Sequence, residues 1–464
     1  MKKRVLLDVF VVLIMSFLLY YGASWQFTTL YSDAAKYQCY ATAFWHGVSA
    51  LKTIPMSDIQ CDFITHPSSG ISFITNDMLL HFMMRHNVPS WLIGFIAEQS
   101  PTQPLHALPH EYPLLTMVPF TFGFVTSVNG YQIAFAIAMI LLTLGVYALL
   151  RVWKSQRAAI AFALYIVVCG WSTAAARFDI LPSGFTLGAL LLAERGRWRW
   201  AYALLAVATL LKLYPIILLP AFLLAQYKSS AEFWRTWWKG LDVFVLLCVV
   251  ITLFSMILSV EGTLGPLGYF RDRPIQVEST AASLLWLGSF LGFSLHYAAT
   301  FGSLNMLSSL SSIVSPMMTV LFIVGLLYVY WLQWRMKLPL ADSLVLILLV
   351  AICTGKVFSP QYLLWVIPFV AYISEWDKRW LIGWTVIGLL TTWIFPYLYL
   401  STTVFIDVAT LPTFNPSVFI RNILLLTFLI LLLYRYTARK NGVVSGDVSQ
   451  HPQSESMISM AQAD

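Results

Sequence analysis

The sequence predicts an all-α integral membrane protein, a bundle of about twelve transmembrane helices. Hydrophobic residues make up 59% of the 464 residues, charged residues make up 11%, and the mean hydropathy is +0.75. Soluble domains carry about 25% charged residues, so this chain has too little polar surface to cover a water-soluble globule. In addition, apolar runs recur along the chain, many of them near the roughly 20 residues that cross a bilayer.

Twelve apolar segments are expected to build the bundle. The first follows Met1-Lys2-Lys3-Arg4 and has no small-residue cleavage site, so we expect a retained helix and not a removed signal peptide. No repeat of fixed period is detected, which argues against a solenoid and weakens an inverted-repeat transporter. The expected spans are 5–23, 130–150, 158–175, 180–194, 198–211, 214–227, 240–260, 315–334, 342–355, 362–375, 380–399 and 416–434.

Two further apolar stretches are not counted as full spans. A span at 112–128 would move Arg151, Lys154 and Arg157 to the outer side, so we expect a partly inserted outer segment there. The stretch 281–312 is rich in Ser, Gly and Leu, and is expected to form a re-entrant or interfacial pair.

Lysine and arginine predict the orientation, because cytoplasmic loops carry their excess. With the N-terminus inside, most of the 28 basic residues fall in inner segments. We therefore expect a multi-pass protein of the plasma membrane with both termini in the cytoplasm, a membrane domain at 1–440, an outer loop at 24–129 and a disordered Ser- and Gln-rich tail at 441–464. The inner basic residues are Lys2, Lys3, Arg4, Arg151, Lys154, Arg157, Arg195, Arg197, Arg199, Lys228, Arg235, Lys239, Arg335, Lys337, Lys378, Arg379, Arg435, Arg439 and Lys440.

Several classes of site find no support in the sequence. The basic residues form no continuous face, so no nucleic-acid partner is expected. Without a DxD motif, a GxGxxG motif or a Walker motif, we predict neither a metal nor another cofactor. Cys39 and Cys61 share the outer loop and would form a disulfide in an oxidising compartment, although two free thiols are an equal alternative.

The informative basic residues lie on the outer side at the ends of different helices. Such a group suits an anionic ligand at the membrane interface. The alternative for each residue is snorkelling to the headgroups, and this is the reading preferred for Arg421. Lys36, Lys52 and Arg85 need only be solvated in the first outer loop. The remaining cations are Arg177 in AARFDILP, Lys212 in LLKLYP, Arg271 and Arg273 in YFRDRPIQVES, and Lys356 in TGKVFSPQY.

Carboxylates lie on the same predicted face: Asp33 in LYSDAAKYQCY, Glu111 in HEYPLL, Asp179 and Glu278. A carboxylate beside phosphate-binding cations suits a base-assisted displacement at a sugar carbon, because the base takes the acceptor proton while the cations stabilise the leaving phosphate. Two plainer roles stay open. Asp33 could cap a loop helix, and Asp179 could neutralise Arg177.

These motifs carry a resemblance to a known family. GKVFSPQYLLWVIPF, at 355–369, resembles a segment of the polyprenyl-phosphate-sugar-dependent glycosyltransferases of the GT-C class, in glycosyltransferase family 87. Four further pieces resemble that family in the same order: SDAAKY, the EYP of HEYPLL, ARFDILP followed by LLKLYP, and RDRPIQVES. The resemblance extends over almost the whole membrane region and fails across an insertion at about 63–109 and in the tail.

The resemblance implies a GT-C-like bundle whose first long outer loop carries the catalytic carboxylate, here Asp33. It implies inverting transfer of a hexose, with mannose first among the candidates, from a polyprenyl-phosphate donor to a hydroxyl of a lipid or glycan acceptor at the non-cytoplasmic face. The competing class is a transporter or flippase of lipid-linked saccharides, but the one-sided charges favour an enzyme. The expected phosphate ligands are Arg177, Lys212, Arg273 and Lys356, and the expected substrate-binding residues are Glu111, Tyr112, Asp179, Gln276, Glu278, Ser359, Gln361 and Tyr362.

Overall fold

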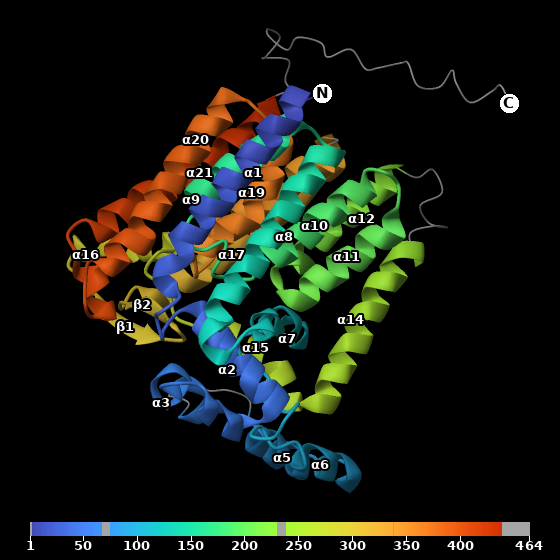
Figure 1. Cartoon of the computed structure of the whole chain (residues 1–464), viewed down its shortest axis with the longest axis vertical. Coiled ribbons are helices and arrows are strands. Elements are labelled where there is room, and N and C mark those ends of the chain that lie inside the picture. Colours follow the sequence, from blue (N-terminus) through green and yellow to red (C-terminus); the bar gives the residue numbers. More distant parts are fainter. Residues whose placement is uncertain (1, 67–74, 230–237, 337, 439–464) are drawn as a thin grey trace, which may run out of the picture.

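Each of the twelve predicted apolar segments is helical in the computed structural model, which describes residues 2–66, 75–229, 238–336 and 338–438 (Figure 1). The predicted tail lies outside the described residues, as do Arg235, Lys337, Arg439 and Lys440. The twelve helices are α1 (Lys2–Ala23), α8 (Tyr131–Trp153), α9 (Gln156–Gly170), α10 (Ile180–Ala193), α11 (Trp198–Leu211), α12 (Leu219–Ser229), α14 (Trp238–Leu258), α17 (Ser311–Met336), α18 (Leu340–Thr354), α19 (Leu363–Ser374), α20 (Lys378–Thr392) and α21 (Phe414–Ala438).

Only half of these helices are long enough to cross a bilayer by themselves. In the described residues six are sufficiently long and apolar, namely α1, α8, α14, α17, α20 and α21. A helix rises about 1.5 Å per residue, so the 15 residues of α9 or α18 reach only about 22 Å of a core of about 30 Å. The chain is therefore a multi-pass membrane protein, while the count of twelve crossings stays a prediction.

Short helices lie at the centre of the bundle, and long helices lie at its periphery. The short helices α18 and α19 lie at the centre, where Leu344, Ile347, Leu364 and Phe369 are all 0% exposed. The long helices α1, α14 and α17 instead keep most of their apolar side chains on the outside of the bundle. Because apolar side chains that face outward need a nonaqueous neighbour, the long helices form the lipid-facing layer around a core of short ones.

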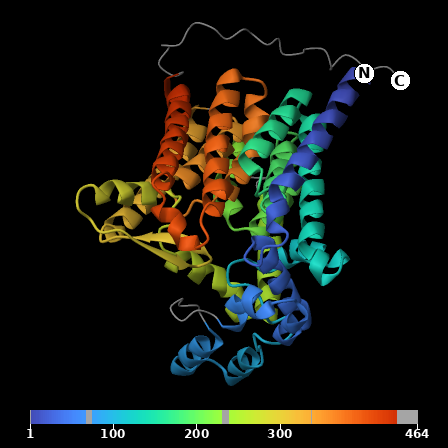
Figure 2. The same ribbon diagram turned by 60° about the vertical axis from the view of Figure 1, so that its left-hand side comes forward.

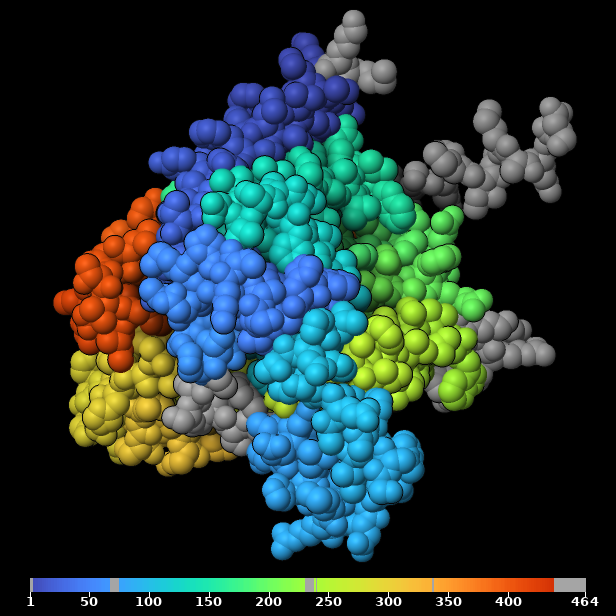
Figure 3. All heavy atoms as spheres, turned by 60° about the horizontal axis from the view of Figure 1, so that its bottom comes forward, coloured from blue at the N-terminus to red at the C-terminus, as the bar shows by residue number. Residues whose placement is uncertain are grey.

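The end of the molecule opposite the N-terminus is made of loops and short helices, and we call it the loop end (Figures 1 and 2). Viewed from this end, residues of the first long loop cover the middle of the face (Figure 3). Its helical segments are α2 (Asp33–His46), α3 (Ser57–Gln60), α4 (Asp62–Thr65), α5 (Asn76–Arg85), α6 (Ser90–Ala97) and α7 (Met117–Phe120), with 3-10 turns at Ser24–Gln26, Val48–Thr53, Leu114–Thr116, Thr121–Val125 and Val128–Gly130.

A disulfide between Cys39 and Cys61 fastens this loop, which settles the alternative that the sequence left open. It joins α2 to the turn between α3 and α4. Around it lies a small buried cluster that includes Leu51 and Ile54. The segment at 112–128 consists of 3-10 turns and the four-residue α7, so it forms no helix long enough to span a membrane.

The expectation of an all-α fold, with a re-entrant or interfacial pair at 281–312, is wrong in part. A short helix, α16 (Thr280–Ser289), is followed by an antiparallel hairpin of β1 (His296–Thr300) and β2 (Ser303–Leu307). Phe301 and Gly302 both have positive φ, which is the geometry of a tight two-residue turn that matches strand twist. In Figure 2 the hairpin projects from the side of the bundle near the loop end.

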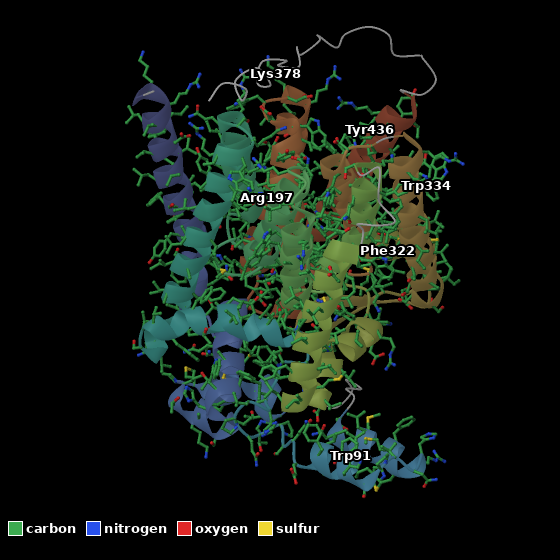
Figure 4. The ribbon with its side chains drawn as sticks, turned by 90° about the vertical axis from the view of Figure 1, so that its right-hand side faces the viewer. Trp91, Arg197, Phe322, Trp334, Lys378 and Tyr436 are labelled. Atoms are coloured by element: carbon green, nitrogen blue, oxygen red, sulfur yellow. A yellow bond between two sulfur atoms is a disulfide. The ribbon has the colours of Figure 1, made fainter. Side chains whose placement is uncertain are left out.

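The labelled side chains in Figure 4 mark the two ends of the molecule. Arg197, Lys378 and Tyr436 lie in the half that carries the N-terminus, while Trp91 of α6 lies at the opposite end. Basic segments far apart in the sequence thus gather at one end, as the orientation argument requires. Which end faces the cytoplasm stays a prediction.

Candidate functional site

A cavity of about 270 Å³ lies at the loop end, between segments that are far apart in the sequence. Its wall contains nine of the residues predicted from sequence, together with several aromatic side chains. The predicted residues are Asp33, Glu111, Tyr112, Arg177, Arg273, Gln276, Glu278, Ser359 and Gln361, and the other lining residues include Trp25, Gln26, Tyr31, Tyr269, the hairpin tip Phe301–Gly302, Phe395, Tyr399 and Phe405.

Asp33 is the first residue of α2, but it does not cap the helix. The cap is Ser32, whose hydroxyl oxygen accepts a hydrogen bond from the Ala35 amide at 3.1 Å. The Ser32 hydroxyl also donates to Gln132 of α8 at 2.9 Å, which fixes the start of α2 against the bundle. The Asp33 side chain is therefore directed to the cavity, where 21% of it is exposed.

Asp33 forms an ion pair with Arg177, with 2.5 Å between Oδ2 and Nε. Arg177 lies in the turn between α9 and α10, and its Nη1 donates to the Ser359 hydroxyl at 3.2 Å. Its guanidinium also lies 5.4 Å from the Phe395 ring centre. The turn is anchored to the chain before α2, because Gln26 Nε2 donates to the Ser172 carbonyl at 2.6 Å. Two segments almost 150 residues apart are thus held together at the carboxylate.

Asp179 does not neutralise Arg177, contrary to the alternative raised from sequence. It is buried and pairs with Lys212, with 2.5 Å between Oδ1 and Nζ. Trp365 Nε1 donates to the same oxygen at 2.6 Å, and the Trp365 ring stacks on Tyr362 at 4.0 Å. Lys212 and Tyr362 line a second, smaller cavity that shares Glu111, Tyr112, Tyr269, Arg273 and Gln361 with the first.

The RDRPIQVES segment is held as an extended strand between two partners. The Val277 amide donates to Leu304 of β2 at 3.1 Å, and the Gln276 amide donates to the Lys356 carbonyl at 3.0 Å. Its first two residues, Arg271 and Asp272, are the last of helix α15 (Val260–Asp272), and the extended part begins at Arg273, before Pro274, which cannot continue the helix. Arg273, Gln276 and Glu278 of this segment all line the larger cavity.

Arg273 is the cation most available to a ligand. It lines both cavities, and its guanidinium lies 5.5 Å from the Tyr269 ring centre. Within the described residues no carboxylate lies within 4.0 Å of it, and its buried Nε has no hydrogen-bond partner there. A buried donor without a partner is costly, so an anion entering the cavity would satisfy it.

Lys356 is not brought into either cavity. Its ammonium donates to the Arg271 carbonyl at 2.8 Å, and Lys356 is not among the lining residues of either cavity. Burial lowers the pKa of Lys356 from its ordinary value, with Asp272 acting against this shift. Its main-chain carbonyl holds the strand in place, and this is the role that the geometry supports.

The interpretation of Arg421 as a snorkelling residue is wrong. Its side chain is 0% exposed and pairs with Glu278 at 2.8 Å, and its Nη2 donates to the Glu278 main-chain oxygen at 2.6 Å. Tyr399 and Asn422 also bind Glu278. Because Glu278 forms a fully buried ion pair, it is held rigidly in the cavity wall. It is therefore poorly placed to exchange a proton with a substrate.

Three features of the site escaped the sequence argument. Tyr269 lies four residues before Arg273, a spacing that places both on one side of a helix end, so this signal was available. Its hydroxyl donates to the Phe301 carbonyl at 2.5 Å and thereby holds the hairpin tip at the cavity. Lys36, treated as a solvated charge, is half-buried on α2 one turn after Asp33. The contact of Tyr399 with Glu278 spans 121 residues and has no local sequence signal.

No cluster of three or more His, Cys, Asp or Glu side chains that could hold a metal ion occurs in the part of the chain that the structure describes. The cavity wall instead combines two arginines, three carboxylates and a ring of aromatic side chains. Such a wall can bind an anionic group and the apolar faces of a polar ligand at the same time.

Comparison with known proteins identifies the family. No curated protein matches the chain. The model of glycosyltransferase family 87 matches residues 112–360, which is more than half of the chain. The match contains Arg177, Lys212, Arg273, Glu278 and Lys356, whereas Asp33 lies before it. The chain belongs to glycosyltransferase family 87, a family of GT-C membrane glycosyltransferases, and it is a membrane glycosyltransferase.

Proposed function

We propose that the protein transfers a hexose, mannose first among the candidates, from a polyprenyl-phosphate donor to a hydroxyl of a lipid or glycan acceptor at the non-cytoplasmic face. The observation that carries the proposal is the meeting of Asp33, Glu111, Arg177 and Arg273 at one cavity of the loop end. Family membership supports transfer over the transporter or flippase alternative.

In the proposed reaction Asp33 is the general base. Its carboxylate takes the proton of the acceptor hydroxyl as the acceptor oxygen forms a bond to C1 of the sugar. The bond between C1 and the phosphate oxygen breaks, and its electron pair leaves with polyprenyl phosphate, so the configuration at C1 inverts. Arg177 orients Asp33 through Oδ2, and the exposed part of the carboxylate faces the cavity.

Arg273 stabilises the departing phosphate in this proposal. It lines both cavities without a carboxylate partner in the described residues, so its charge is free to meet the negative charge that builds up on the leaving group. Lys212 lines the smaller cavity but shares its charge with Asp179, which makes it a secondary phosphate ligand. Tyr31 and Phe405 at the larger cavity provide apolar surfaces for the sugar or the acceptor.

The test is transfer by the purified protein from a panel of polyprenyl-phosphate sugars, with Asp33→Asn and Glu111→Gln compared side by side. Asp33→Asn keeps the shape of the side chain and removes its basicity, so turnover is expected to fall about 10²- to 10⁴-fold while donor binding persists. Glu111→Gln is the matched control, because Glu111 lines the same cavity.

The alternatives give different results. An active Asp33→Asn protein together with an inactive Glu111→Gln protein would transfer the role of base to Glu111. A fall in melting temperature with unchanged activity of the folded fraction would make Asp33 a structural partner of Arg177. Absence of transfer from every polyprenyl-phosphate donor would exclude the donor class.

A further inference from the structure

We propose that a groove between α8, α10 and α11 binds an anionic phospholipid, with an acyl chain in the groove and the phosphate at Arg195. The groove has a volume of about 450 Å³ and shares no lining residue with either cavity of the active site. Every lining residue is apolar: Leu142, Gly145, Val146, Leu149, Trp153, Ile180, Leu181, Gly184, Phe185, Gly188, Leu192 and Leu204.

The groove lies on the lipid-facing side of the bundle. Its walls are half-buried side chains such as Leu142, Leu149 and Leu204, and the neighbouring Leu141 of α8 is 62% exposed. Gly145 keeps the groove open, because a Cβ at this position would meet no atom within 4 Å. A hollow of this size and composition, open to the bilayer, suits a hydrocarbon chain and offers nothing to a polar headgroup.

Charge determines the end at which the headgroup would lie. Arg195 follows α10. Its guanidinium lies 4.1 Å from the ring centre of Trp153, which lines the groove. Its Nη1 donates to the Leu191 carbonyl at 2.9 Å. Arg197 and Arg199 follow and are exposed. The acidic neighbour Glu194 already accepts a hydrogen bond from the Tyr372 hydroxyl. Cations with interfacial tryptophans are the surface that an anionic headgroup prefers.

The opposite end of the groove does not suit a phosphate. Ile180 lies there directly after Asp179, whose buried carboxylate is bound by Lys212 and Trp365. The groove residues at that end are apolar, and the nearby cation Lys212 is already paired with Asp179, so neither offers a phosphate a charged partner. A phospholipid of the leaflet at the N-terminal end would place its phosphate near the arginines and its acyl chain in the apolar groove. The isoprenoid carrier of a donor would instead have its phosphate at the loop end.

Native mass spectrometry of the purified full-length protein tests this site with palmitoyl-oleoyl phosphatidylglycerol and phosphatidylcholine as probes. Phosphatidylglycerol is expected to bind at least about fivefold more tightly, since each nearby basic residue favours anionic lipid by about that factor. Arg195→Gln should remove most of that preference, and Gly145→Leu, which fills the groove, should weaken binding of both lipids.

Two matched controls lie outside the groove: Lys378→Gln removes an exposed cation at the same end, and Leu141→Met changes an exposed side chain of α8. Both should bind lipid as the wild type does. Equal binding of the two lipids by the wild type, or wild-type binding by both Arg195→Gln and Gly145→Leu, would overturn the proposal. Displacement of phosphatidylglycerol by a lower concentration of polyprenyl phosphate would overturn it in favour of a carrier chain. Arg195→Gln keeps the test valid if Gly145→Leu fails to fold.

Discussion

Two ion pairs at the cavity differ in how far their side chains are exposed. Asp33 and Arg177 are 21% and 11% exposed, whereas Glu278 and Arg421 are 1% and 0% exposed. A partly exposed carboxylate can exchange its cationic partner for water or substrate at low cost, while separating a fully buried pair leaves a charge in a medium of low polarity. The first pair therefore suits chemistry, and the second suits support of the wall.

The buried pair leads to a stability prediction. Arg421→Gln is expected to lower the free energy of unfolding by about 3–5 kcal/mol, because it leaves the Glu278 carboxylate buried without its cation. Thermal unfolding in detergent measures the effect. Arg435→Gln, an exposed position of the same helix, is the control and should change stability by no more than about 0.5 kcal/mol. Equal melting of the two variants would show that the Arg421–Glu278 pair does not stabilise the fold.

A second prediction separates Arg273 from Lys356. Arg273→Gln is expected to reduce transfer about ten- to a hundredfold, because one charge-assisted hydrogen bond to the donor phosphate contributes about 1.5–3 kcal/mol. Lys356→Gln should cost less than tenfold, since its ammonium binds the Arg271 carbonyl and lines neither cavity. The measurement is kcat/KM for both variants. A larger loss for Lys356→Gln would show that Lys356, and not Arg273, contacts the donor phosphate.

At the scale of single elements, the outer loop depends on a covalent tie. The Cys39–Cys61 bond spans 22 residues and fixes the segment after α2, the helix that begins at Asp33. Few apolar residues cluster around this bond compared with the main core, so packing alone orders the segment weakly. The disulfide therefore helps to order the loop segment that follows the helix carrying the candidate base.

Removing the disulfide should therefore loosen the loop. The double variant Cys39→Ala, Cys61→Ala is expected to lose about 3 kcal/mol, the value typical of closing a loop of roughly this length. Limited proteolysis between α2 and α5, together with thermal unfolding, would detect the change. Cys248→Ala controls for the loss of a thiol. Unchanged proteolysis and melting in the double variant would mean that the fold orders this loop without the bond.

The elements that the sequence predicts well are those with a local signal. Apolar runs and their length predicted every helix of the bundle, because burial and lipid contact act on each helix separately. The β1–β2 hairpin was missed, since its strands are short and its support comes from residues 275–277 and from Tyr269. The same distinction between local and long-range signals applies to the side-chain contacts of the site. The gathering of Asp33, Arg177 and Arg273 was predicted from their common face, but the choice of Lys212 for Asp179 and of Arg421 for Glu278 depends on three-dimensional packing.

At the scale of the whole molecule, the two ends have different chemistry. Arg197 and Lys378, two of the predicted inner basic residues, lie in the half that carries the N-terminus (Figure 4). Both cavities and the Cys39–Cys61 disulfide belong to the loop end. Disulfides persist in oxidising compartments, and Lys and Arg accumulate on the cytoplasmic side. Two independent physical arguments thus predict the same orientation, with the loop end outside the cytoplasm.

This orientation can be measured by labelling single cysteines from outside the cell. Cys248 is first replaced by Ser, while Cys169 and Cys353 are buried. Cysteines at Tyr31 and Leu267, which are exposed at the loop end, should react with an impermeant reagent, and cysteines at Trp200 and Lys378 should react only after the membrane is opened.

The most demanding comparison is Ser359 with Lys378, because only the 12-residue α19 and a single 3-10 turn separate their levels in the bilayer. If the impermeant reagent labels Ser359 but not Lys378, α19 connects the two sides of the membrane. Since α19 is too short to span an undistorted core, its neighbours must then thin the bilayer or shield the helix from it. Labelling of both positions from one side would instead make α19 a buried helix that does not cross, and the count of twelve crossings would be wrong.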